Sequence, residues 1–138
     1  MANVLSFEDL EIWKKAQELA TMVYRLCELN EKINRDFSFK DQIKRAALSV
    51  SNNIAEGFEY SNNPDFHRFL RIAKGSCGEV RNCLLFSIKI NYCSTEYISD
   101  SLELSKSLSK HIGAMMKYLR QKIMDKKLTS KTIKLQNP

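Results

Sequence analysis

A row of polar side chains at helical spacing is the part of this sequence best suited to acid/base chemistry. The row lies in the segment QIKRAALSVSNNIAEG, residues 42–57, and consists of Gln42, Arg45, Ser49, Asn53 and Glu56. Intervals of three or four residues place these side chains on one face of a helix, beside an apolar stripe. We therefore expect the row to border packed surface, where an arginine or a carboxylate is costly unless it meets a partner.

The segment that follows supplies possible partners. The turn at residues 61–64 predicts a helical hairpin, with Asn63 as the cap of the second helix and Pro64 in its first turn. An antiparallel register would pair Glu56 with Arg68, Ser49 with Gly75 or Ser76, Arg45 with Glu79, and Gln42 with Asn82. We interpret these residues and Asn53 as a structural network that fixes the register. The alternative is an acid/base site of Glu56 and Glu79, which is disfavoured because the arginines would hold both carboxylates ionised.

Positive charge is concentrated at the C-terminal end of the chain. Residues 104–138 contain nine basic residues and one acidic residue, Asp125, whereas the first 103 residues contain 13 basic and 15 acidic ones. This asymmetry indicates a polyanionic partner, nucleic acid before membrane, and a solvated helix end with a frayed tail is an equally open alternative. The candidate binding residues are Lys106, Lys110, Lys117, Arg120, Lys122, Lys126 and Lys127, with Arg68, Arg71 and Lys74 as a second patch.

The composition predicts an all-α protein. There are only four glycines and two prolines, at positions 64 and 138, so few residues interrupt helices. Apolar periodicity predicts helices at about residues 7–30, 39–60, 64–91 and 95–124, and short connections favour an antiparallel, up-down-up-down four-helix bundle over residues 1–124. Residues 125–138 are predicted to be a flexible basic tail. The small residues of Gly75-Ser76-Cys77-Gly78 would allow a facing helix to come close, and the alternative of a phosphate-binding loop lacks a preceding strand and a following GK[ST].

No pattern of residues predicts a catalytic, metal or cofactor site. His67 and His111 lie outside any HExxH or ExxH arrangement, and the four cysteines form no CxxC pair. Packed, reduced thiols in a cytoplasmic protein are the expectation. No run of 18 uncharged apolar residues indicates a membrane span, and no secretory signal is recognisable at the N-terminus.

Three motifs together resemble a known bacterial family. They are F-x-x-L-x-x-W at Phe7, Leu10 and Trp13, QIKRAALSVSNNIAEG at 42–57, and FHRFLRIAKGSCGE at 66–79. The chain resembles, over about residues 5–120, the four-helix-bundle proteins first named from reading frames inside intervening sequences of 23S ribosomal RNA genes. The resemblance implies a ring-like homopentamer. It also implies similarity to the accessory variability protein of diversity-generating retroelements, which binds nucleic acid and contacts a reverse transcriptase.

The sequence thus predicts a non-enzymatic, homo-oligomeric helical protein that binds structured RNA or DNA through phosphate contacts. Such binding would tolerate many sequences and depend steeply on salt. The alternative is a protein-interaction scaffold, for example an accessory subunit of a reverse transcriptase.

Overall fold

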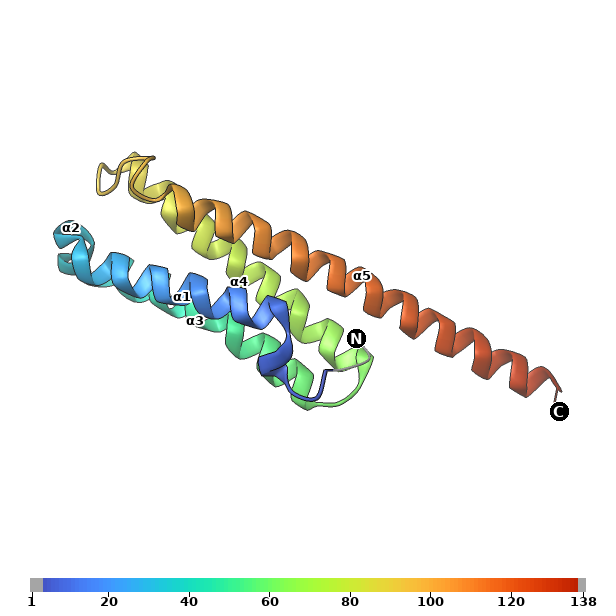
Figure 1. Ribbon diagram of the computed structural model, residues 1–138. Coiled ribbons are helices and arrows are strands. Elements are labelled where there is room, and N and C mark those ends of the chain that lie inside the picture. Colours follow the sequence, from blue (N-terminus) through green and yellow to red (C-terminus); the bar gives the residue numbers. More distant parts are fainter. Residues whose placement is uncertain (1–3, 137–138) are drawn as a thin grey trace.

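The protein is a bundle of helices in the computed structural model, which describes residues 4–136 (Figure 1). Over this range the chain contains no strand. The elements are the 3-10 helix η1 (Phe7–Asp9), α1 (Glu11–Leu29), the short α2 (Glu31–Arg35), α3 (Phe37–Glu59), α4 (Asn63–Lys89) and α5 (Ser99–Gln136). Four long helices and a short one therefore form a helical bundle, as the sequence predicts. The expected domain division also includes residues 1–3 and 137–138, which lie outside the described range.

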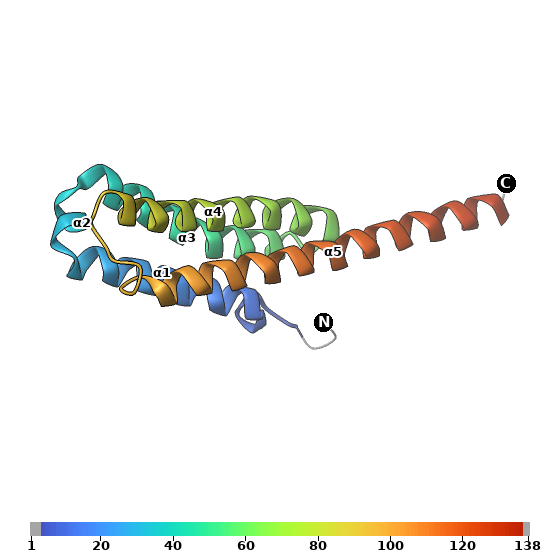
Figure 2. The same ribbon diagram turned by 90° about the horizontal axis from the view of Figure 1, so that it is seen from above.

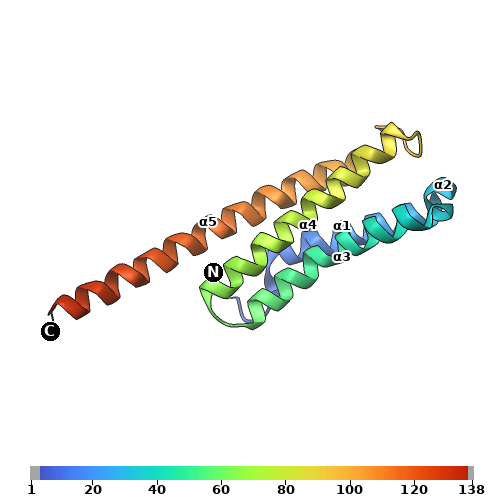
Figure 3. The same cartoon turned by 180° about the vertical axis from the view of Figure 1, so that it is seen from behind.

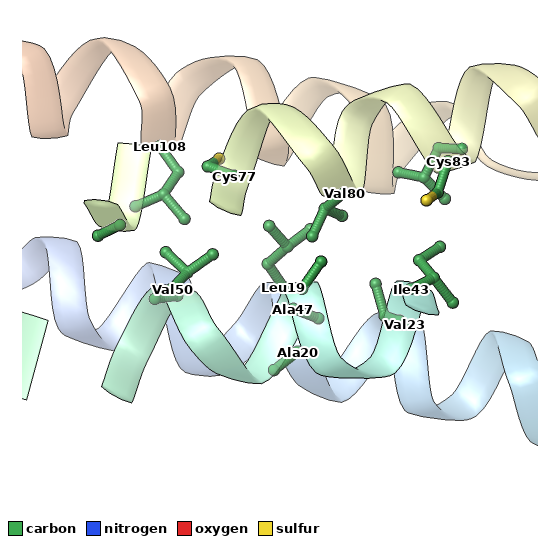
Figure 4. Close-up of a cluster of buried hydrophobic side chains, with 14 of the residues drawn as sticks. Leu19, Ala20, Val23, Ile43, Ala47, Val50, Cys77, Val80, Cys83 and Leu108 are labelled. Carbon is green, nitrogen blue, oxygen red and sulfur yellow. The ribbon is translucent and has the colours of Figure 1, made fainter. Parts of the chain in front are cut away.

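The four long helices surround one apolar core. Each long helix contacts two neighbours, in the cyclic order α1, α3, α4, α5, and the diagonal pairs do not meet. Figures 1 and 3 accordingly show α4 with α5 on one side of the molecule and α1 with α3 on the other. Side chains from all four helices meet in the centre, and Figure 4 shows Leu19, Val50, Val80 and Leu108 among them.

Side-chain caps explain where several helices begin. The Asn62 side chain accepts a hydrogen bond from the Asp65 amide at 2.8 Å, so Asn62, rather than the expected Asn63, caps α4. Pro64 lies in the first turn, where a missing amide costs nothing. Asp36 caps α3 in the same way, accepting from the Phe39 amide at 3.1 Å. The polar segment after α1 forms the short helix α2, which begins where the Asn30 side chain accepts a hydrogen bond from the Ile33 amide.

Gly57, and not the glycine pair of α4, allows two helices to approach closely. A β-carbon at position 57 would lie 2.5 Å from the β-carbon of Phe69, so α3 and α4 can meet there only because residue 57 has no side chain. Gly75 and Gly78 are exposed, and a β-carbon at either position would meet nothing within 4 Å. The prediction that they admit a facing helix is therefore wrong within this subunit.

The last helix extends far beyond the bundle (Figure 2). It spans 38 residues and ends at Gln136, so the helix end expected near residue 124 is wrong. The helix can continue because residues 125–136 contain neither glycine nor proline and include four lysines, which favour helices. We call the exposed part, residues 120–136, the overhang. Residues 137 and 138 of the expected tail lie outside the described range.

Candidate nucleic-acid interface

The polar row of α3 lies at the surface and does not form the expected ion pairs. Arg45 is mostly exposed and pairs with Asp41 of its own helix at 2.8 Å, and Arg68 pairs with Asp65 of its own helix at 3.4 Å. Glu56 is exposed and meets neither arginine. The predicted pairs Arg45–Glu79 and Glu56–Arg68 are therefore wrong, because water solvates these charges as well as a partner would.

The neutral part of the network is present in a changed form. The hydroxyls of Ser49 and Ser76 lie 2.9 Å apart, which confirms one predicted pair across α3 and α4. The Asn53 amide donates to the Ser49 carbonyl at 2.8 Å. The Gln42 amide donates to the carboxylate of Glu79 instead of meeting the predicted Asn82. These hydrogen bonds fix the register of α3 against α4 at the edge of their contact. Glu79 accepts from Gln42, whereas Glu56 does not share that partner, so the geometry does not favour an acid/base pair of these two exposed carboxylates.

Two contacts join the predicted basic patches across α4 and α5. The Lys74 ammonium donates to the Ser109 hydroxyl at 3.0 Å, and Arg120 lies 3.3 Å from the His67 ring. Ser109 therefore marks the side of α5 that faces α4. Residues that are three, four or eight positions from Ser109 lie on about the same side of the helix. They include Lys106, Gly113 and Lys117. We define the basic seam as Lys106, Lys110, Lys117 and Arg120 of α5 with Arg68, Arg71 and Lys74 of α4.

The pKa of His67 responds to the positive charges of the basic seam. Burial lowers the pKa of the His67 ring below its ordinary value, and the nearby charges of Arg120 and Arg71 lower it further. The ring is therefore neutral at pH 7, since even its ordinary pKa is about 6.5. An anion bound beside Arg120 and Arg71 would offset their positive charge and would therefore favour protonation of the His67 ring.

The seam ends in a cleft lined by lysines. The cleft, with a volume of about 610 Å³, lies between the overhang and the turn at residues 61–64. We call it the lysine cleft; its cations are Lys122, Lys126, Lys127, Lys131 and Lys134, and no carboxylate lines it. The opposite wall is polar and includes Asn62 and Asn63, beside the N-terminus of α4.

Sequence reasoning missed two of these lysines and the opposite wall. Lys131 and Lys134 had been assigned to a flexible tail, so they had no fixed position. The signal that could have found them is the absence of glycine and proline from residues 120–136. With the helix continued, Lys126, Ser130 and Lys134 follow one another at intervals of four on a single face.

Comparison with known proteins identifies the family of the chain. Residues 8–114 match the family described as 23S rRNA-intervening sequence protein. The chain belongs to this family. A solved structure from Bacteroides thetaiotaomicron, described as a protein with unknown function from the S23 ribosomal protein family, has a similar fold, with a TM-score of 0.72 and 24% identity. The similarity covers 77% of this chain and 98% of that one. Among curated proteins, none matches the chain.

In this 23S rRNA-intervening sequence protein, the lysine cleft extends beyond the part shared with the family. The family match ends at residue 114, so every residue of the overhang follows it. Most of the bundle thus lies within the family match, whereas the five lysines of the cleft belong to a C-terminal continuation of α5.

Other groups that could do chemistry are buried or dispersed in the described part of this family member. Cys27, Cys77, Cys83 and Cys93 are free and buried, and burial raises the pKa of Cys77 to about 11, which keeps the thiol protonated and unreactive. Across residues 4–136, no group of three or more potential metal ligands comes together. No helix in the same range is both long and apolar enough to cross a membrane.

Proposed function

We propose that this protein binds nucleic acid, structured RNA or DNA, by contacts to backbone phosphates along the basic seam and in the lysine cleft. The observation that carries the proposal is the lysine cleft, where five ammonium groups line one cavity without a carboxylate. Nucleic acid is the common partner whose closely spaced phosphates match such an array, and ammonium groups contact phosphates as mobile point charges. The role proposed is binding without catalysis.

The spacing of the lysines supports an anionic partner. Lys122 with Lys126, and Lys127 with Lys131, are four residues apart, where like charges destabilise a helix by about 0.2–0.5 kcal/mol for each pair. Counter-ions or phosphates relieve that repulsion. A bound phosphate chain therefore stabilises the overhang as well as being held by it.

Assembly of several copies would strengthen the binding. We propose a homo-oligomer, a ring-like pentamer by family resemblance, built from antiparallel up-down-up-down four-helix subunits. Turns at alternating ends of the bundle support that course of the chain (Figure 1). A ring would present several lysine clefts to one polyanion and raise its affinity by multivalency. A cytoplasmic location is part of the proposal and is supported by the four free thiols.

A second candidate function is a protein-interaction scaffold, for example an accessory subunit of a reverse transcriptase. Leu85 and Phe86 are about half exposed near the end of α4, and they favour this candidate because neighbouring exposed apolar side chains often mark protein contacts. Binding of that kind would be insensitive to the charge of the lysine cleft.

The test is fluorescence anisotropy of a labelled RNA hairpin and a labelled DNA duplex, titrated with protein over a salt series. The test variant replaces the five cleft lysines by glutamine. The matched control removes five exposed charges outside the cleft and the seam, by glutamine at Lys14, Lys32, Arg35, Arg81 and Lys89.

We expect the test variant to lose at least about 100-fold in affinity at low salt, and its slope of log affinity against log salt to flatten by up to about 4.5. The control should lose much less, since its charges are scattered over other surfaces. Equal losses in the two variants would show that only net charge matters. No binding by the wild-type protein even at low salt would overturn the proposal and leave the scaffold.

A further inference from the structure

A second groove lies on the opposite side of the bundle, between α1 and α3. Two cavities of about 590 and 650 Å³ share four lining residues, Tyr24, Lys40, Lys44 and Leu48, so they adjoin, and together we call them the groove. The helices that line it, α1 and α3, lie on the side of the bundle across from α4 and α5, which carry the basic seam (Figure 3).

The groove combines aromatic rings with cations. The Lys44 ammonium lies 4.5 Å from the centre of the Tyr24 ring, and the Lys40 ammonium lies 4.9 Å from the centre of the Phe37 ring. Tyr24 is 41% exposed and Phe37 is 77% exposed, so both rings are accessible at the surface. Exposed rings beside cations are the combination that binds unpaired nucleotides, because every base has a face that can stack.

The charges of the groove favour an anion. Its basic side chains are Arg25, Lys40, Lys44 and Arg45, and its acidic ones are Glu28 and Asp41. Arg45 and Asp41 form an ion pair at 2.8 Å and neutralise each other. Lys40 and Lys44, in contrast, make no ion pair with any carboxylate in the described part of the chain. Lys40 donates a hydrogen bond of 3.5 Å to the neutral Asn34 side chain, so neither positive charge is neutralised by a carboxylate and both can attract phosphates.

We propose that the groove between α1 and α3 binds single-stranded nucleic acid, with one base stacked on Tyr24 and neighbouring phosphates on Lys40 and Lys44. The inference rests on the proposed nucleic-acid binding and adds a second site with a different specificity. A duplex keeps its bases stacked inside, so it cannot use the rings, whereas a loop or an unpaired end can. The exposed side chain of Asn52 in the same groove offers both a donor and an acceptor to a base edge.

Two binding sites would let one subunit bind both the paired and the unpaired regions of a folded RNA. The basic seam and the lysine cleft contact phosphates of any nucleic acid. The groove between α1 and α3 takes only unpaired nucleotides. A hairpin with a free single-stranded end therefore meets the needs of both sites better than a blunt duplex of the same length.

The test compares a labelled 12-nucleotide single-stranded RNA with a blunt RNA duplex of the same length, by anisotropy at fixed salt. Tyr24→Leu removes the ring and keeps an apolar side chain, and Tyr24→Phe restores the ring as a conservative control. Phe37→Leu is a second test, since a side chain that is 77% exposed contributes little to folding. Tyr97→Leu is the matched control, because Tyr97 is 53% exposed and lies outside the groove.

We expect Tyr24→Leu to weaken single-strand binding by about 5- to 100-fold, as loss of base stacking does, without changing the salt slope. Tyr24→Phe, Tyr97→Leu and all duplex affinities should stay within about twofold of wild type. Lys44→Gln should flatten the single-strand salt slope by about 0.7.

Two outcomes separate this inference from the proposed function. If Tyr24→Leu and Phe37→Leu bind the single strand like wild type, while loss of the cleft lysines still weakens it, the inference is wrong and the proposed function remains. Equal weakening of duplex and single strand by Tyr24→Leu would also overturn it. If wild-type protein binds neither probe at low salt, both proposals fail together.

Discussion

The two halves of α5 present the same face to very different surroundings. In the bundle, that face consists of Leu108, Ile112, Met116 and Leu119, all buried against the other helices. Beyond the bundle the same spacing continues through Lys126, Ser130 and Lys134, which line the lysine cleft. The comparison teaches that the period of a helix fixes which side chains share a face, while burial decides which chemistry that face can carry.

The difference has an energetic basis. A lysine on the buried half would need its ammonium group desolvated, which costs several kcal/mol without a partner. On the overhang, the ammonium groups stay in water and keep their attraction for anions. The overhang is therefore free to be selected for binding, whereas the bundle half is constrained by packing.

The largest expected contrast comes from truncating one side chain in each half. Ile112→Ala should lower the free energy of unfolding by about 2–5 kcal/mol, because it leaves a cavity in the core. Lys126→Ala, on the same helix face, should change it by no more than about 0.5 kcal/mol. Urea unfolding followed by circular dichroism measures both.

Either of two results would contradict the difference proposed between the two halves of α5. A large loss of stability in Lys126→Ala would mean that the overhang is packed against something in solution. A small loss in Ile112→Ala would mean that the bundle half of α5 contributes little to the core.

The same contrast between packed and open positions separates two glycines in α3 and α4. Gly57→Ala should destabilise the protein by about 1–3 kcal/mol, because the new β-carbon would lie 2.5 Å from that of Phe69 and the helices would have to move apart. Gly75→Ala should stabilise it by about 0.5–1 kcal/mol, because the added methyl group meets open space and restricts the unfolded chain. Thermal melting of the two variants checks both signs at once.

A loss of stability in Gly75→Ala would contradict the open position of that residue. If the loss grew with protein concentration, it would indicate that another copy of the chain packs on the outer face of α4. Gly78→Ala provides the matched control, since a β-carbon there also meets nothing within 4 Å.

The family and most of the helices could be predicted from the sequence, because motifs and apolar periodicity are local signals. The position of the polar row could not. Gln42, Arg45 and Glu56 flank an apolar stripe, and period alone does not tell whether such a flank lies under a neighbouring helix or in water. In the structure the neighbour, α4, covers the stripe and leaves Arg45 and Glu56 exposed.

The sequence predicted several of the lysines of the candidate binding surface, but it did not predict the cleft that they line. The clustering of lysines near the C-terminus indicated a polyanion partner, and Lys122, Lys126 and Lys127 do line the cleft. The cleft itself depends on a helix that continues without apolar periodicity, and the loss of that period wrongly predicts that the helix ends near residue 124. The groove between α1 and α3 was missed altogether, because Tyr24 and Lys44 are far apart in the sequence and only tertiary packing brings them together.

The smallest expected effect comes from His67, which lies where the two halves of α5 meet. Burial, Arg120 and Arg71 lower the pKa of the ring, so it is neutral near pH 7 in the free protein. A phosphate bound beside Arg120 would favour the protonated ring and raise that pKa. Binding is then accompanied by proton uptake, and we expect the affinity for an RNA hairpin to rise a few-fold as the pH falls from about 7 to about 5.5.

The stability of the free protein should change in the opposite direction. The unfolded chain has the ordinary histidine pKa and takes up its proton first, so acidification below about pH 6.5 lowers the contribution of His67 to stability until the folded ring also protonates. His67→Gln should flatten the pH dependence of binding, and His111→Gln, at the ring that lies 2.6 Å from Lys15, should leave it unchanged. An unchanged pH dependence in His67→Gln would place the bound phosphates away from Arg120, and would limit the anion site to the lysine cleft.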